Sequence, residues 1–195
     1  MTTYDTDPRV QALVSKLLYW ARTANELSES RAALAELRHA LPERERLRAA
    51  PFVAPFLGNT PQENEKWFYL VACLFATHRN YKAGQSLGHA FRAIKDKSGG
   101  METRFLHLLS ADPRRLPDLL RPAVALLAAH DVPLDWYCLL DDALHWNARD
   151  KPRQHKLARD FYFDGNHSDA NNSPSQDDNQ LQDDDTKGTS DAPQD

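Results

Sequence analysis

The sequence contains few β-branched hydrophobic residues. Among its 195 residues there are six Val and one Ile, against 26 Leu and 25 Ala. Val and Ile favour extended strands, whereas Leu and Ala lose little side-chain freedom in a helix. A β-sheet protein is therefore excluded. We expect an all-α fold, a helical bundle of about eight to nine helices.

Cysteine is also scarce, since Cys73 and Cys138 are the only two. They lie far apart within apolar helical patterns, which favours buried, reduced thiols over a disulfide scaffold or a metal knuckle. No apolar run reaches the roughly 18 residues that suggest a membrane-spanning helix. The N-terminus lacks the basic and then apolar order of a signal peptide. We therefore expect a cytoplasmic protein with no membrane partner.

Strong catalytic and metal signatures are missing: there is no nucleophile elbow, phosphate-binding loop, CxxC pair or HExxH motif. The one enzyme-like feature is His130-Asp131, because helical metal phosphohydrolases carry such a dipeptide and complete the site with other His and Asp residues. A His near a helix end also simply complements the helix dipole. We expect no catalytic residue, no metal and no cofactor, with an HD-type phosphohydrolase as the weaker alternative.

Negative charge is concentrated at one end of the chain. The formal charge of −4 includes nine Asp and one Lys in residues 164–195, which leaves 23 Lys and Arg against 19 Asp and Glu in residues 1–163. The last segment has almost no apolar residues, so burial could not offset the backbone entropy lost on ordering. We predict a helical domain over 1–163 and a disordered acidic tail over 164–195. The tail either aids solubility or screens a basic surface.

The clearest helix start lies at Thr60, Pro61 and Glu63, which form a capping box with proline in the first turn. The apolar residues that follow, from Trp67 onward, form a stripe wide enough for a central core helix. Ser86 is predicted to cap a later helix.

Two later helices contain prolines and a pair of acidic residues that affect their predicted structure. Pro117 and Pro122 fall within one apolar repeat and predict an interrupted or kinked helix, because proline removes a backbone donor and crowds the preceding turn. In the next helix, Asp141 and Asp142 are predicted to face water. A glycine pair interrupts the helical pattern and suggests a boundary between two small lobes near residues 97–100.

Local positive charge is the main functional signal. Basic residues gather at loops and helix ends around residues 79–104, 114–121 and 149–159. Arg and Lys contacts to phosphate give salt-dependent affinity without reading bases, so such a protein would follow a nucleic-acid backbone rather than recognise a sequence. The same charges also suit a helical adaptor that binds only protein, and the sequence leaves that alternative open.

Several segments together resemble a known family. LVACLFATH is followed by SLGHAFR, METRFLHLLSADPRRLPDLL, PLDWYCLLDDALHW and KLARDFYF, all within residues 31–163. In this order and spacing they are similar to the CasB family, the small subunit of the type I-E CRISPR surveillance complex called Cascade.

The resemblance implies an all-helical, noncatalytic subunit that is present in two copies and contacts the backbone subunits and the large subunit. It also implies contacts with crRNA, target DNA and the displaced strand, which stabilise the R-loop during antiviral defence. On the matching segments, the implied nucleic-acid-binding residues are Arg31, Arg38, Arg92, Arg104, Arg114, Arg115, Arg121, Arg149, Lys151, Arg153 and Lys156.

Overall fold

The computed structural model describes residues 7–97 and 99–163, and the regular structure in these ranges is helical. The α-helices are α1 (Pro8–Thr23), α2 (Ser28–His39), α3 (Ala50–Val53), α4 (Gln62–Thr77), α5 (Leu87–Arg92), α6 (Met101–Leu109), α7 (Leu116–Ala129), α8 (Trp136–Leu144) and α9 (Pro152–Tyr162). Two 3₁₀ segments, η1 (Glu43–Ala49) and η2 (Ala54–Phe56), flank α3. The all-α prediction is confirmed. No helix in the described part is both long and apolar enough to span a membrane.

Two predictions concern how the chain is divided. The predicted disordered tail over 164–195 lies outside the described residues. The predicted lobe boundary near residues 97–100 stays a prediction.

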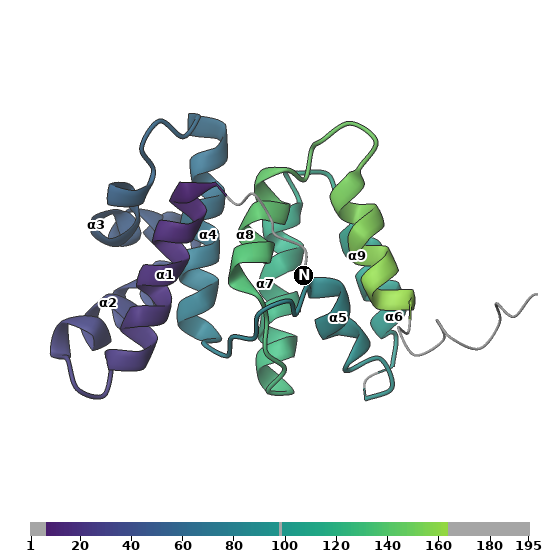
Figure 1. Ribbon diagram of the computed structural model, residues 1–195, viewed down its shortest axis with the longest axis horizontal. Coiled ribbons are helices and arrows are strands. Elements are labelled where there is room, and N and C mark those ends of the chain that lie inside the picture. The colour runs from purple at the N-terminus through teal and green to yellow at the C-terminus, as the bar shows by residue number, and fades with distance from the viewer. Residues whose placement is uncertain (1–6, 98, 164–195) are drawn as a thin grey trace, which may run out of the picture. The chain divides into compact units, whose positions relative to one another are not determined.

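Helix α4 is the centre of the hydrophobic core, as its apolar stripe predicts. Residues 70–76 are all buried, together with Trp67 and Phe68. The helix packs against α1 and α2 and also against α7 and α8, and Figure 1 shows it between these two pairs. Because α4 contacts so many neighbours, side chains on its edges are placed beside residues that are distant in sequence.

Helices α5 and α9 pack together unusually closely (Figure 1). A Cβ atom on Gly88 would lie 2.2 Å from the carbonyl oxygen of Leu157, so only glycine permits this approach. Ser86 caps α5, as predicted, by accepting a hydrogen bond from the N–H of His89 at 3.3 Å. The same hydroxyl donates to Asp160 Oδ2 of α9 at 2.6 Å, so the cap also ties the two helices together.

The capping box predicted at Thr60 is wrong. Helix α4 begins after Pro61, which stands at the N-cap position and offers no side-chain cap. The backbone N–H of Thr60 donates to the carbonyl oxygen of Leu57 at 2.9 Å and is therefore not available to Glu63. The Thr60 hydroxyl also donates to Leu57 and accepts from Arg9. These contacts of the preceding turn replace the local motif.

The prolines do not interrupt α7, so the predicted interruption is wrong, whereas the alternative of a kink stays a prediction. Pro117 lies in the first turn, where the missing N–H would have no helical partner. Pro122 lies inside the helix, which nevertheless continues to Ala129. The carbonyl group that Pro122 leaves without a donor belongs to Asp118, which is exposed, so water can reach it.

Asp141 and Asp142 do not face water, contrary to the prediction. They are 4% and 2% exposed and lie where α8 meets α9. Arg153 of α9 places Nη2 2.7 Å from Asp141 Oδ2 and Nη1 3.6 Å from Asp142 Oδ1. Burial raises the pKa of Asp142 to about 7, although Lys156 and Arg153 act in the opposite direction. The prediction failed because the cations that accompany these acids belong to another helix.

The raised pKa of Asp142 predicts a pH-dependent stability. Because this pKa lies above the ordinary value of 3.8, the folded state binds the proton more tightly than the unfolded state. The resulting stabilisation is fully present below about pH 4 and is lost as the pH rises through 7, by about 1 kcal/mol per pH unit between pH 5 and 7.

The variant Asp142→Asn isolates this effect, because its side chain does not titrate. Its melting temperature, relative to that of the unmodified chain, should rise between pH 5 and pH 8. Thermal unfolding followed by circular dichroism measures the difference. A difference that stays constant over this range would show that Asp142 does not titrate as described.

Candidate nucleic-acid interface

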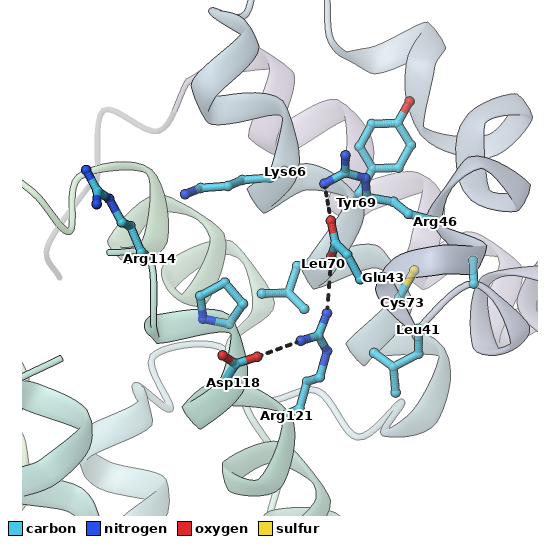
Figure 2. Close-up of a pocket in the computed structure, with 12 residues that line it drawn as sticks. Leu41, Glu43, Arg46, Lys66, Tyr69, Leu70, Cys73, Arg114, Asp118 and Arg121 are labelled. Carbon is cyan, nitrogen blue, oxygen red and sulfur yellow. Dashed lines mark hydrogen bonds and ion pairs between the residues drawn. The ribbon is translucent and has the colours of Figure 1, made fainter. Parts of the chain in front are cut away.

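A pocket of about 270 Å³ opens between η1, α4 and the beginning of α7 (Figure 2). It is lined by Ala40, Leu41, Glu43, Arg46, Lys66, Tyr69, Leu70, Cys73, Arg114, Pro117, Asp118 and Arg121. Four of these side chains are cationic and two are anionic, which gives the lining a net charge of +2. Apolar side chains of α4 form one wall. Such a lining suits an anionic ligand that also has apolar surface.

Glu43 lies between two arginines of the pocket, as Figure 2 shows. Its Oε1 is 2.7 Å from Arg46 Nη1, and its Oε2 is 3.5 Å from Arg121 Nη2. The guanidinium of Arg121 also places Nη1 3.2 Å from Asp118 Oδ1. The Nε of Arg121 is buried and has no hydrogen-bond partner among the described residues. Arg121 therefore keeps an unused donor despite its two acidic neighbours.

The other two cations of the pocket have no acidic partner among the described residues. These are Lys66 and Arg114. The ammonium of Lys66 lies 4.6 Å from the centroid of the neighbouring Trp67 ring. The Asp112 side chain accepts a hydrogen bond from the backbone N–H of Arg114 at 2.8 Å and so fixes the turn. The side chain of Arg114 is exposed. Both charges are free to attract phosphate.

The cysteine at the base of the pocket is not a nucleophile. Burial raises the pKa of Cys73 to about 12, so the thiol stays protonated at neutral pH. Cys138, in α8, is also buried and free, and burial raises its pKa to about 12. The prediction of two buried, reduced thiols is confirmed.

The structure brings only some of the predicted residues to this pocket. Arg114 and Arg121 line it, and Arg115 is exposed next to Arg114. Arg92 and Arg104 line two other hollows, the first beside α5 and the second between α6 and α7. A further set is exposed on other elements: Arg31 on α2, and Arg149 and Lys151 in the turn before α9. The predicted residues thus lie on several surfaces.

In the described part of the chain, five of the predicted cations bind groups of the fold itself. Arg121 pairs with Glu43 and Asp118, and Arg153 pairs with the buried Asp141, as described above. Lys156 Nζ lies 2.8 Å from Asp160 Oδ2 within α9. Arg92 donates a hydrogen bond to the carbonyl oxygen of Phe163. Arg38 of α2 donates to the carbonyl oxygen of Ala76, at the end of α4, with Nη2 at 3.2 Å. Contacts of this kind position α2, α8 and α9.

Arg46 and Lys66 are absent from the predicted set. Arg46 belongs to an alternating Glu-Arg run, and Lys66 is a single cation at the edge of a core helix. Neither stands out from the local density of charge along the sequence. Only the packing of η1 and α7 against α4 brings them beside Arg121.

The His130-Asp131 pair occupies a helix end rather than a metal cluster. No group of three or more potential metal ligands occurs within residues 7–97 and 99–163. His130 is the C-cap residue of α7, and its backbone N–H donates to Leu126. Asp131 has a positive φ of 55° and accepts a hydrogen bond from Asn80. These contacts give His130 and Asp131 structural roles at the end of α7.

The fold and the pocket define an all-helical protein with a basic pocket and no metal-ligand cluster in its described part. The chain belongs to the Cse2 family of CRISPR-associated proteins, since the model of that family, CRISPR-associated protein Cse2, matches residues 33–162. A relative of the same description from Thermus thermophilus is 35% identical over 155 residues, which cover 77% of this chain and 90% of the relative.

Solved structures agree with this assignment. CasB from Thermus thermophilus is 34% identical, with a TM-score of 0.64 over 76% of this chain and 96% of the other. CasB from M. ruber is 32% identical, with a TM-score of 0.63 over 79% and 92%. A chain of a CRISPR RNA-guided surveillance complex, 23% identical, shares the fold with a TM-score of 0.62 over 78% and 91%. The predicted membership of the CasB family is confirmed.

Proposed function

We propose that this protein is a noncatalytic small subunit of a type I-E Cascade complex that binds nucleic-acid backbones without reading their sequence. The observation that carries the proposal is the basic pocket between η1, α4 and α7, where Lys66 and Arg114 have no acidic partner among the described residues. Membership of the Cse2 family supports a place in a CRISPR assembly. The proposed partners are crRNA, target DNA, the backbone and large subunits, and a second copy of the chain, in the cytoplasm.

The proposed role requires only modest contacts. Forming an R-loop exchanges a DNA duplex for an RNA–DNA duplex of similar stability, so a few protein contacts to the strands can shift the balance. Cations that are not neutralised by the protein contribute most, because binding phosphate breaks no existing ion pair. Besides the pocket, the exposed residues Arg31, Arg115, Arg149 and Lys151 form no ion pair with any residue that the structure describes.

One observation favours protein contacts as well. A hollow of about 510 Å³ between α6 and α7 is lined mainly by apolar side chains, among them Leu108, Leu119 and Leu126. Arg104 and His107 lie among these lining residues. An apolar surface of this kind suits a protein partner better than a nucleic-acid backbone. An adaptor that binds only protein is therefore the second candidate function.

Reversing Arg114 and Arg115 to Glu distinguishes the two functions in the assembled complex. Neither side chain forms an ion pair with another described residue, so the fold and assembly should persist. Target-DNA affinity should fall about tenfold, because two cations next to the pocket become anions. Co-purification measures assembly, and gel-shift titration measures affinity. Unchanged affinity in the intact complex would remove these residues from the interface and favour the adaptor.

A further inference from the structure

We propose that the pocket is a phosphate-binding site whose two arginines are held by Glu43 until a nucleic-acid phosphate replaces its carboxylate. This inference rests on the proposed function and assigns one contact of that function to specific atoms. The ligand is a single phosphodiester group of a DNA or RNA strand.

The geometry of Glu43 resembles that of the proposed ligand. One carboxylate oxygen faces Arg46 at 2.7 Å and the other faces Arg121 at 3.5 Å. A phosphodiester also presents two unesterified oxygens that share one negative charge, and arginine side chains donate charge-assisted hydrogen bonds to such oxygens. The carboxylate therefore occupies the position that a phosphate would take between the two guanidinium groups.

Two features indicate that the arrangement favours exchange over permanent pairing. The longer of the two distances, to Arg121, is at the limit of a hydrogen bond. The side chain of Glu43 is 66% exposed, so it can rotate into water without disturbing the core.

The remaining cations determine which anion is preferred. Lys66 extends from α4 on the side of the pocket where Arg114 lies (Figure 2), and neither has an acidic partner among the described residues. A polyanion can place one phosphate between the arginines and the next phosphates near Lys66 and Arg114. An isolated carboxylate such as that of Glu43 cannot reach both places, so a nucleic-acid strand competes successfully with it.

The variant Glu43→Gln tests the competition. It removes the internal anion but keeps the size of the side chain, so the arginines become available to phosphate. Exposed ion pairs are individually weak, and we therefore expect an affinity for oligothymidylate about three- to tenfold higher than that of the unmodified chain at low salt. Fluorescence anisotropy of labelled oligothymidylate measures the affinity.

The matched control is Glu26→Gln, which removes the same charge from an exposed residue between α1 and α2 that does not line the pocket. This control should bind like the unmodified chain. A second control repeats Glu43→Gln in a chain that also carries Arg46→Ala and Arg121→Ala, where the gain should disappear.

The outcomes separate this inference from the proposed function. If the unmodified chain binds but Glu43→Gln binds no better than Glu26→Gln, the competition is wrong while the proposed function stands. If Glu43→Gln binds more weakly, Glu43 orients the arginines instead of competing, which also overturns the inference. If no variant binds nucleic acid, alone or within the assembled complex, both proposals fall.

Discussion

Reversing Lys66 and Arg114 to Glu together should weaken the binding of single-stranded DNA by about 30- to 100-fold at low salt. Both cations line the pocket and neither has an acidic partner among the described residues, so no carboxylate of that part of the chain neutralises their charge. Each reversal removes an attraction to phosphate and adds a repulsion. The slope of log affinity against log salt should also become shallower by about 1.4, because two contacts to a single strand are lost.

A control with the same change in net charge shows whether position matters. Arg22 at the end of α1 and Arg159 on α9 are exposed, and neither lines the pocket. Reversing these two residues should lower the affinity only slightly, with a salt slope close to that of the unmodified chain. Far-ultraviolet circular dichroism confirms that both variants are folded. Equal losses in the two variants would mean that bulk charge, and not the pocket, binds the nucleic acid.

Replacing Gly88 by Ala should destabilise the fold by about 3 kcal/mol. The new Cβ would lie 2.2 Å from the carbonyl oxygen of Leu157 and 2.9 Å from Cβ of Asp160. The nearest obstacle is backbone, which cannot rotate away, so α5 and α9 would have to separate. Separation would also weaken the hydrogen bond between Ser86 and Asp160. For a chain of this size, the melting temperature should fall by about 10 °C.

Gly99→Ala is the matched control for this prediction. A Cβ on Gly99 would meet no atom within 4 Å. Because the new methyl group would displace no neighbour, the melting temperature of this variant should stay within about 2 °C of the original. If Gly88→Ala melted at the same temperature as Gly99→Ala, the close contact between α5 and α9 would not exist in solution.

Much of the fold could be predicted because composition and apolar spacing act locally. The excess of Leu and Ala and the stripe that begins at Trp67 predict an all-α chain with a central α4. Two of the failures have a common cause, because residues that are distant in sequence decide the outcome there. Thr60 is bound by Arg9, and Asp142 is paired with Arg153. Neither partner is visible in the local pattern.

The segments that carry the family resemblance turn out to be largely structural. In SLGHAFR, Ser86 caps α5 and Gly88 permits its contact with α9. In PLDW, Asp135 caps α8 by accepting two backbone N–H groups and also accepts from Gly84, while Trp136 is buried. In KLARDFYF, Asp160 accepts a hydrogen bond from the Ser86 hydroxyl. Resemblance in these segments therefore predicts the fold better than it predicts which cations bind nucleic acid.

The pocket shows where prediction from sequence stops. Arg114 and Arg121 belong to a dense basic stretch and can be found from charge alone. Glu43, Arg46 and Lys66 cannot, because they come from an alternating Glu-Arg run and from a core helix. Their juxtaposition arises when η1 and α7 pack on α4. A binding site assembled from separate elements is invisible until those elements are placed.

The central claim is that the protein binds nucleic-acid backbones without cleaving them or reading their sequence. A salt titration of its binding to single- and double-stranded DNA and RNA, without added metal and with cleavage monitored, tests this most directly. We predict that the logarithm of the affinity falls linearly with the logarithm of the salt concentration, and that the affinity is similar for unrelated sequences. The strands should remain intact. Cleavage of the strands or a strong sequence preference would contradict the account. So would a failure to bind both as the isolated protein and within the assembled complex.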